Sequence, residues 1–385
     1  MKTILVLGVG IAAVPVIHQT MKTTVLKSKD LKMVVVNPTD YFLWPIAMPR
    51  LVVPGQLPDS KVIYELPPAF KDYPADKFEF VRGRAAALDA QSNVASIALN
   101  SAGTREIAYD VLIIATGSSA KENMPWKMLD TSAQTFDRIH SIQQKVKSSE
   151  TIVVVGGGAT GIETAGELGF EYAKNGTKDV YFIHSGALPL GDHIKDSVRK
   201  QARDELEKLN VKIISNTTVT STTPSGDNVV LQLTAADGTT KSLTTGAYLP
   251  TMGMVPNTSF LPSSMLDTYG FVKQTTTLQA EGHKNIFVIG DAGSLEGNMA
   301  LAADAQANHL IKTLPAFLKG ETVAEYKKSD KVMMSVTVGR ARGTGQVGSF
   351  KIFSFLVWYL KGRFLGTDYV ANLVAGKRSI LTKFD

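Results

Sequence analysis

The stretch TIVVVGGGATGIETAGELGFEY, residues 151–172, decides the fold. It begins with the apolar residues Ile152–Val155, a composition typical of a buried parallel strand. Gly156, Gly158 and Gly161 follow at the spacing GxGxxG, and apolar residues then recur at helical intervals. Strand, glycine turn and helix in this order are typical of a dinucleotide-binding unit. In such a unit the backbone amides at the start of the helix bind phosphate groups.

Length and composition indicate a globular chain with more than one domain. At 385 residues the chain is long for a single core, so we expect two or three domains. Hydrophobic residues make up 44% and charged residues 20%, which argues against general disorder. The absence of cysteine excludes disulfides, thiolate metal sites, cysteine-ligated iron–sulfur clusters and dithiol redox catalysis. We therefore predict no metal site and expect a reducing, cytoplasmic location.

Positive charge is concentrated in the C-terminal segment. The net charge is +6, and residues 326–385 hold 11 Lys/Arg against 3 Asp, or +8. Such a segment could contact phosphate-rich cofactors, anionic lipid or nucleic acid. No recognised nucleic-acid module accompanies it, so we do not predict nucleic acid as a partner. No apolar run reaches the ~18 residues that a transmembrane helix needs.

The N-terminus carries a second copy of the glycine motif. Ile4–Leu7 is a predicted strand, and the residues after it form the pattern GxGxxA, in which alanine can replace the third glycine. The same offset of 148 residues separates Gly8 from Gly156 and Gly10 from Gly158. The chain therefore contains one module twice, which indicates two bound nucleotides. In the first copy we expect five residues to contact the nucleotide: Gly8, Val9, Gly10, Ala12 and Ala13.

Three further strands end at residues suited to a bound dinucleotide. The strand Met33–Val36 ends at Asn37, where an acid usually accepts hydrogen bonds from the adenosine ribose, and asparagine can also bond a hydroxyl. YDVLIIATGS includes Thr116 and Gly117, and NIFVIGDAG includes Asp291. A carboxylate at that strand end can accept hydrogen bonds from ribityl or ribose hydroxyls. We predict all four residues as cofactor contacts.

The segments between these strands are less specific. Residues 41–56, YFLWPIAMPRLVVPGQ, look like a loop packed against a ligand. Their only cation, Arg50, is either a surface arginine or a phosphate or flavin contact. Alternation predicts four short antiparallel strands: Phe78–Arg82, Ala85–Leu88, Val94–Leu99 and Glu106–Tyr109. The second half should repeat the plan with a strand at Val180–His184, a helix to about Leu209, a strand at Val229–Leu233 and a later helix over residues 300–311.

The two glycine modules, the ATG strand and the VIGDA strand together resemble the two-dinucleotide flavoprotein reductases of the glutathione-reductase fold. The resemblance implies an α/β chain with two tandem Rossmann-like dinucleotide-binding domains and a small C-terminal α+β domain. FAD would bind residues 1–119 with 254–325, and residues 326–385 would form the third domain. NAD(P)H would bind residues 120–253 through Gly156, Gly158 and Gly161. The disulfide-reductase branch requires a cysteine pair, which this chain lacks.

The C-terminal stretch SVTVGRARGTGQVGSFKIFSFLVWYLKGRFLGTDY is similar to the tail of the apoptosis-inducing-factor-like and ferroptosis suppressor family. That resemblance implies an FAD-dependent NAD(P)H oxidoreductase that reduces a quinone-like acceptor. Glu163 and Lys361 match family residues near the flavin and nicotinamide, so we predict them as catalytic. Apart from the resemblance, they could be a helix-end acid and a solvated cation. The residues implied to hold FAD include Gly8, Gly10, Arg50, Ala85 and Asp291.

Other functions stay open at this point. An FAD-dependent dehydrogenase or oxidase of an organic, biosynthetic substrate could do without nicotinamide, although the intact Gly156 motif favours nicotinamide. A redox-controlled, pro-death signalling flavoprotein is a third possibility. His184 and Ser185 follow the second nucleotide strand, with neither an acid nor an arginine at that point, so NADH and NADPH are not distinguished.

The tail has two interpretations. Residues Phe350–Leu365 are largely apolar, and as a helix they would be apolar on more than one face, which is rare on a surface. We favour packing over the flavin, with Lys361 at the acceptor site. Alternatively the tail lies in a membrane interface, with its cations on anionic headgroups, and the protein is peripheral to a membrane. Lys2 stands where lipidated relatives have the glycine needed for myristoylation, so we expect no lipid there.

Overall fold

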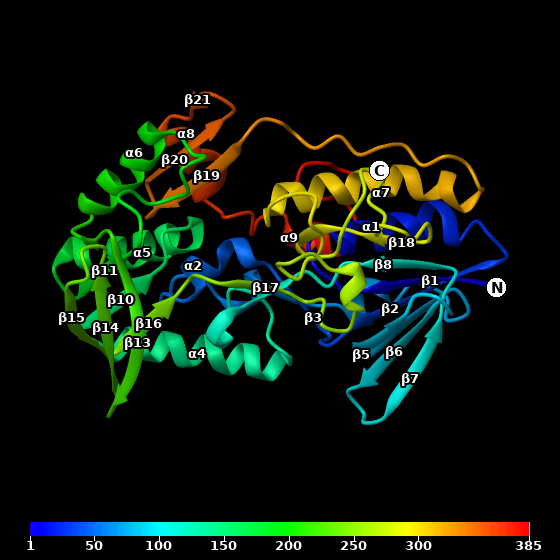
Figure 1. Cartoon of the computed structure of the whole chain (residues 1–385), viewed down its shortest axis with the longest axis horizontal. Coiled ribbons are helices and arrows are strands. Elements are labelled where there is room, and N and C mark those ends of the chain that lie inside the picture. The colour runs from blue at the N-terminus through cyan, green and yellow to red at the C-terminus, as the bar shows by residue number, and fades with distance from the viewer. Residues whose placement is uncertain (385) are drawn as a thin grey trace.

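The computed structural model describes residues 1–384 (Figure 1). The first sheet has seven strands in the order β18-β8-β1-β2-β5-β6-β7. The four strands at the β18 end of this order pair in parallel, and nearly all of their residues are buried. They are β1 (Lys2–Leu7), β2 (Leu31–Asn37), β8 (Val111–Ile114) and β18 (Ile286–Val288). Because both faces are covered, these strands are continuously apolar and do not alternate.

The two faces of the first sheet contribute to different cores. Ile4 and Val6 belong to the core beneath α1 (Ala13–Thr20) and α7 (Ala300–Leu318), whereas Leu5 and Leu7 belong to the opposite core. Successive strand residues point to opposite faces, so one apolar run serves both cores. Figure 1 shows α1 and α7 together above the strands. The predicted α/β class is confirmed.

The edge of this sheet differs from the sequence prediction. The segments Phe78–Arg82 and Ala85–Leu88 are not separate antiparallel strands but one strand, β5 (Phe78–Asp89). Its first part pairs in parallel with β2, and its second part pairs antiparallel with β6 (Val94–Leu99). The parallel pairing ends at Arg82 and the antiparallel pairing begins at Gly83, with a register irregularity between Ala85 and Ala87 inside the second part. Such a bulge increases the local twist of the antiparallel part. β7 (Thr104–Ala108) completes the sheet.

The second sheet is parallel and has the order β12-β11-β10-β16. Its strands are β10 (Thr151–Val155), β11 (Asp179–Ile183), β12 (Lys212–Ile214) and β16 (Ala247–Pro250). The helices of this half are α4 (Ser132–Ser148), α5 (Ala159–Glu171) and α6 (Asp196–Glu207). An antiparallel sheet adjoins it, made of β13 (Thr217–Ser225), β14 (Asn228–Ala235) and β15 (Thr240–Thr245).

A short antiparallel ribbon connects the two halves. It consists of β9 (Ser118–Ala120) and β17 (Met254–Pro256), the points where the chain leaves the first sheet and returns to it. The remaining strands β3 (Tyr41–Leu43) and β4 (Ile63–Glu65) form a small hairpin. Two short helices lie nearby, α2 (Met48–Leu51) and α3 (Pro67–Phe70). Further helical turns cover Met21–Val25, Pro45–Ala47, Asp59–Lys61, Lys121–Asn123, Ala173–Asn175, Ser263–Met265 and Gly290–Ala292.

The C-terminal segment crosses from one half to the other (Figure 1). After α7 the chain runs back to β19 (Met333–Val338), which pairs with β20 (Arg342–Val347) and β21 (Phe350–Lys351). This sheet packs on α5 closely, and a Cβ added at Gly166 would lie 2.7 Å from the Gly339 nitrogen. The last elements are α8 (Ser354–Val357), the turn η8 (Trp358–Gly362) and α9 (Val370–Val374).

A single helix over Phe350–Leu365 does not form. Phe350 and Lys351 pair with β20, and helical structure covers only α8 and η8. The apolar run therefore begins as a strand, because its first residues complete the β19–β20 sheet. The chain then returns to the first half, where the Ile380 amide donates to Asp304 Oδ1 at 2.6 Å.

Candidate functional site

The first glycine turn is shaped by its backbone. Gly8 has φ +97°, and a Cβ there would overlap the carbonyl of Ala115 on the neighbouring strand, so only glycine fits. Gly10 is different, because an added Cβ would meet no atom within 4 Å. The space beside Gly10 is therefore open to a ligand. Val9 and Ala12 line the same space, whereas Ala13 is buried behind it in the core.

A cavity of about 390 Å³ adjoins this turn. It extends from the end of β2 to the start of α7, and most of the residues predicted to bind the first nucleotide line it. These are Gly8, Val9, Gly10, Ala12, Asn37, Ala85, Thr116, Gly117 and Asp291. The end of β2 and the turn after β1 meet there because β1 and β2 are parallel neighbours. The cavity is suited to an extended ligand bound along the carboxyl ends of the strands.

Asn37 supports the turn directly. Its Oδ1 accepts a hydrogen bond of 3.0 Å from the Val9 amide, and its Nδ2 donates to the Thr39 carbonyl at 2.7 Å. An aspartate could accept from Val9 but could not donate to Thr39. The asparagine at this strand end therefore holds the first glycine turn to the segment after β2.

Asp291 is paired with two residues that the sequence did not single out. Its Oδ2 accepts hydrogen bonds from Ser118 Oγ at 2.7 Å and from Lys127 Nζ at 2.9 Å. Lys127 and Ser118 both line the cavity. Lys127 lies in irregular chain between the ATG strand and α4, where no periodicity marks it. The structure thus adds a cation to the predicted carboxylate of this site.

The Thr116–Gly117 turn is tied to the returning chain. Thr116 Oγ1 donates to the Asn257 carbonyl at 2.7 Å, and Asn257 Nδ2 donates back to the Thr116 carbonyl at 2.9 Å. Gly117 has φ +65°, a conformation that favours glycine. These bonds close the cavity wall at the β9–β17 ribbon.

The second glycine turn repeats the geometry of the first. Gly156 has φ +122°, and a Cβ there would lie 2.5 Å from Thr251 Oγ1. Gly158 is open, like Gly10, with no atom within 4 Å of an added Cβ. A Cβ at Gly161 would overlap the Gly156 carbonyl, so this glycine lets α5 pack against the turn. The three predicted glycines therefore have the backbone surroundings that the motif requires.

His184 lies beside this second turn. Its ring is buried, and its Cβ would be 3.0 Å from a Cβ added at Gly157. Nε2 lies 3.2 Å from Ser215 Oγ, whereas Nδ1 has no hydrogen-bond partner among the described residues. Burial lowers the pKa of His184, and Arg199 contributes in the same direction, against an opposing effect of the backbone at Gly186 that is smaller than that of burial. His184 follows the last residue of β11, the strand end at which dinucleotide-binding folds generally recognise a ribose.

Glu163 and Lys361 are brought together. Lys361 Nζ donates to Glu163 Oε1 at 2.6 Å and to the Ser335 carbonyl at 2.9 Å. The Thr337 amide donates to the same Glu163 oxygen at 3.1 Å. The Glu163 side chain is 7% exposed and that of Lys361 24%. The pair connects the first turns of α5 with η8, although 198 residues separate the two in sequence.

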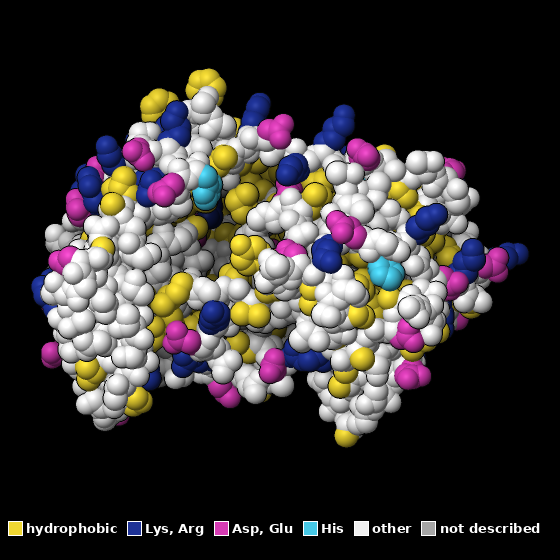
Figure 2. All heavy atoms as spheres, viewed as in Figure 1, with side chains coloured by type: hydrophobic (Ala, Val, Ile, Leu, Met, Phe, Trp, Pro, Cys, Tyr) yellow, Lys and Arg dark blue, Asp and Glu magenta, His cyan; other side chains and the backbone are white. Residues whose placement is uncertain are grey.

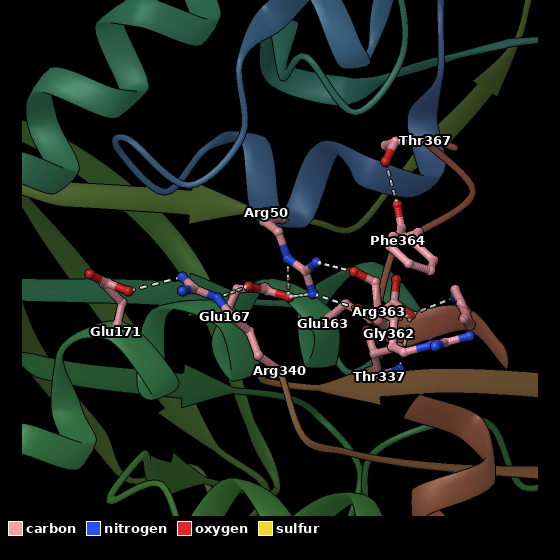
Figure 3. Close-up of polar contacts among 11 residues, drawn as sticks. Arg50, Glu163, Glu167, Glu171, Thr337, Arg340, Gly362, Arg363, Phe364 and Thr367 are labelled. Atoms are coloured by element: carbon pink, nitrogen blue, oxygen red, sulfur yellow. Dashed lines mark hydrogen bonds and ion pairs between the residues drawn. The ribbon is translucent and has the colours of Figure 1, made fainter. Parts of the chain in front are cut away.

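Arg50 does not line the cavity. Its guanidinium donates to Glu167 Oε1 from Nε at 3.0 Å and from Nη2 at 2.7 Å (Figure 3). Glu167 is one helical turn after Glu163 on α5. The arginine therefore belongs to the ion-pair cluster around Glu163, and sequence reasoning missed its partner Glu167.

Comparison with known proteins identifies the family. The family model for pyridine nucleotide-disulphide oxidoreductases matches residues 2–308. Oxidoreductase ptaL of Pestalotiopsis fici is 38% identical over 377 residues, which cover 97% of this chain and 98% of that protein. Ferroptosis suppressor protein 1 of Mus musculus is 28% identical over 297 residues, covering 74% and 76%. The family match includes both glycine turns, because it spans residues 2–308.

A solved structure shows the same fold. The sulfide:quinone oxidoreductase of Aquifex aeolicus superposes with a TM-score of 0.77 at 16% identity, covering 98% of this chain and 92% of that one. The family match gives FAD and NAD(P)H as the cofactors, as the two glycine turns predicted. The chain is an oxidoreductase that belongs to the pyridine nucleotide-disulphide oxidoreductase family, in its apoptosis-inducing-factor-like branch.

Proposed function

We propose that this oxidoreductase takes a hydride from NAD(P)H onto FAD and passes the electrons to a quinone-like acceptor. The cavity beside the first glycine turn carries the proposal, because its walls fit a dinucleotide with a flavin. The space at Gly10 allows a pyrophosphate to approach the backbone, and Asp291 with Lys127 offers hydrogen-bond partners to a ribityl chain. When bound, FAD supplies the hydride acceptor, and the protein supplies alignment and electrostatics.

We assign the two nucleotides to separate domains. Residues 1–119 and 254–325 would bind FAD, residues 120–253 would bind NAD(P)H, and residues 326–385 would form the C-terminal domain. The open space at Gly158 supports the second assignment, because it mirrors the space at Gly10. Gly156 and Gly161 would keep the second turn close to α5, as Gly8 keeps the first turn close to β8.

Glu163 and Lys361 would act on the nicotinamide side of the flavin. Glu163 lies in the second turn of α5, and its carboxylate accepts hydrogen bonds from Lys361 and from the Thr337 amide. The ammonium group of Lys361 would stabilise negative charge that develops during electron transfer. Glu163 would orient that ammonium group and the nicotinamide ribose.

The acceptor class is tested by steady-state turnover. Support for a quinone comes from the solved structure of similar fold, which is named a sulfide:quinone oxidoreductase. The resemblance of the C-terminal stretch to the ferroptosis suppressor family supports the same acceptor class. We expect the purified protein to oxidise NADH or NADPH rapidly in the presence of short-chain quinones and slowly with oxygen alone. If oxygen supports the same rate as every quinone, the acceptor assignment is wrong.

Peripheral contact with a membrane is part of the proposal. Among residues 1–384, no helix is both long and apolar enough to cross a membrane. The C-terminal segment nevertheless exposes a group of hydrophobic side chains, here called the aromatic surface: Phe350, Phe353, Phe355, Tyr359, Leu360 and Phe364. Phe350 and Phe353 are each 79% exposed. Figure 2 shows hydrophobic side chains standing out from the surface where Figure 1 places β21 and α8.

Cations accompany the aromatic surface, as expected for contact with anionic headgroups. Lys351 lies between two of the phenylalanines in sequence, and the Arg363 guanidinium lies 3.9 Å from the centroid of the Tyr359 ring. We expect the protein to float with anionic liposomes, and F350S/F353S to reduce that binding. Y269S removes an equally exposed aromatic from another part of the chain and should change nothing. Equal flotation of all three proteins would contradict membrane contact through this surface.

A further inference from the structure

We propose that Arg50 is a positioning residue, which fixes Lys361 against Glu163 by joining three distant parts of the chain. The proposal rests on the proposed function, which places Glu163 and Lys361 beside the flavin and nicotinamide. It gives Arg50 a different task from the FAD contact that the family resemblance implied. Figure 3 shows the guanidinium between α5 and the end of η8.

The contacts of Arg50 come from two directions. On one side, Nε and Nη2 both donate to Glu167 Oε1 of α5, at 3.0 and 2.7 Å. On the other side, Nη2 donates to the Gly362 carbonyl at 2.9 Å, and Nη1 lies 3.4 Å from the Arg363 carbonyl. Arg50 itself is held by α2, and it is only 8% exposed. One planar group therefore connects α2, α5 and the C-terminal segment.

The carbonyls that Arg50 holds belong to the residues directly after Lys361. The Lys361 side chain has four rotatable bonds, so its ammonium position depends on where its backbone is held. A second donor from the same part of the chain pins this segment, because Trp44 Nε1 donates to the Leu365 carbonyl at 2.7 Å. Trp44 is fully buried. The chain on the C-terminal side of Lys361 is thus fixed by Arg50 and Trp44 together.

The carboxylates on α5 complete the arrangement. Glu163 and Glu167 are four residues apart, so their side chains share one face of the helix. Glu163 accepts from Lys361, and Glu167 accepts from Arg50. Glu167 Oε2 also faces Arg340 Nε at 3.5 Å, and Arg340 Nη2 pairs with Glu171 at 2.9 Å. Because Glu167 is 1% exposed, removing the Arg50 charge leaves a buried carboxylate with one distant partner.

A lysine at position 50 cannot reproduce these contacts. It keeps the charge, but its single nitrogen has no fork with which to reach Glu167 and two carbonyls together. R50K should therefore loosen the segment after Lys361 while the flavin cavity stays intact. We expect kcat to fall about tenfold to a hundredfold, as for a reacting group displaced by a fraction of an ångström, with KM for NAD(P)H nearly unchanged.

The decisive experiment is a double-mutant cycle with K361M. If Arg50 acts through Lys361, R50K should cause almost no further loss of kcat in the K361M protein. E167Q, which removes the other partner of Arg50, should behave like R50K. The control is R105K, since Arg105 also binds a glutamate through two nitrogens but does so between β7 and β5 of one sheet. R105K should leave kcat and KM as in the wild type.

Hydrogen–deuterium exchange gives a readout that does not need turnover. Amides between Trp358 and Leu365 should exchange at least about tenfold faster in R50K than in the wild type or R105K, because local opening becomes easier. This holds with or without FAD, so the positioning role can be tested even if the wild type reduces no quinone.

Three results would overturn the proposal. They are unchanged exchange in R50K, full independent loss of kcat when R50K is added to K361M, and release of FAD by R50K with an unchanged kcat in the reloaded protein. The last result would make Arg50 a flavin contact. A wild type whose flavin is not reduced by NADH or NADPH would instead defeat the proposed function, and the exchange measurement would still decide the role of Arg50.

Discussion

The two glycine turns share a sequence pattern and a backbone geometry, yet their surroundings differ. In both turns the first glycine has positive φ and leaves no room for a Cβ beside the end of a neighbouring strand. The second glycine faces open space in both. The first turn adjoins a cavity of about 390 Å³, and its helix α1 is covered by α7 and the C-terminal end of the chain. The helix after the second turn, α5, carries three carboxylates: Glu163, Glu167 and Glu171.

This difference shows that the motif determines the geometry of the turn but not the side chains that surround the following helix. Three or four residues of a GxGxxG turn determine the same backbone geometry in both places, the geometry that binds phosphate in dinucleotide-binding folds. The segments that pack on the following helix determine whether apolar or charged side chains surround it. α1 has no acidic residue and is buried mainly against apolar neighbours, whereas α5 has three acids, and Lys361 and Arg340 from the C-terminal segment pair with them. The surroundings of the first turn are suited to holding a cofactor. The helix after the second turn is suited to placing charged side chains beside a reacting cofactor.

The largest expected effect comes from G10V. An added side chain would fill the space at Gly10, so the affinity for FAD should fall at least about a thousandfold and the purified protein should carry almost no flavin, because the lost phosphate contacts are worth about 4 kcal/mol. The variant should fold, since no chain atom lies within 4 Å of the new Cβ. The flavin-to-protein absorbance ratio measures the effect, and circular dichroism checks the fold. A yellow G10V protein with one flavin per chain would mean that this turn does not bind FAD.

G158V is the matched change in the second turn. It should keep FAD but slow flavin reduction by NAD(P)H about a hundredfold, corresponding to about 3 kcal/mol of lost binding. Rapid mixing at a fixed, low coenzyme concentration gives this rate. If G158V loses flavin and G10V keeps it, the assignment is reversed: FAD would bind at the second turn and NAD(P)H at the first.

Removing the charged pair should have a smaller effect. K361M and E163Q should each lower kcat about tenfold to a hundredfold, as expected for one electrostatic group in a water-poor site. Flavin content should stay as in the wild type, because neither residue lines the cavity. Turnover with NADH and a soluble quinone gives kcat, and absorbance gives flavin content. A loss of flavin without a change in kcat would place the pair in the FAD site.

The smallest expected effect concerns Lys127. K127M removes the ammonium group that pairs with Asp291, and it should weaken FAD binding about tenfold, since a partly exposed charge contributes little more than 1 kcal/mol. R82M, which breaks the exposed Arg82–Asp40 pair, serves as the control. Fluorescence titration of flavin-free protein measures both affinities. Identical affinities for the two variants would remove Lys127 from the site.

Local patterns predicted the elements well where short-range rules apply. Both glycine turns, the parallel strands and the Gly-Asp strand end were recognisable because their geometry depends on residues within a few positions. The pairing of β5 with two different strands was not recognisable, because tertiary packing decides which strands pair. The strand at Phe350 was missed for the same reason, since β20 supplies its hydrogen bonds.

The candidate site was predicted only in part. Glu163 and Lys361 were predicted through family resemblance. Their separation of 198 residues in sequence gives no sign that Lys361 Nζ lies 2.6 Å from Glu163 Oε1. Lys127 and Glu167 were missed because their partners, Asp291 and Arg50, are far away in sequence. Ion pairs between distant segments leave no periodic signal, so only the fold reveals them.

Anaerobic stopped-flow mixing of the purified protein with NADH or NADPH tests the central claim most directly. We predict that the flavin absorbance near 450 nm bleaches rapidly with at least one coenzyme and returns when a quinone is added. G158V in the same instrument should keep its absorbance at the same coenzyme concentration. A flavin that neither coenzyme bleaches in the wild type, or one that no quinone reoxidises, would contradict the account.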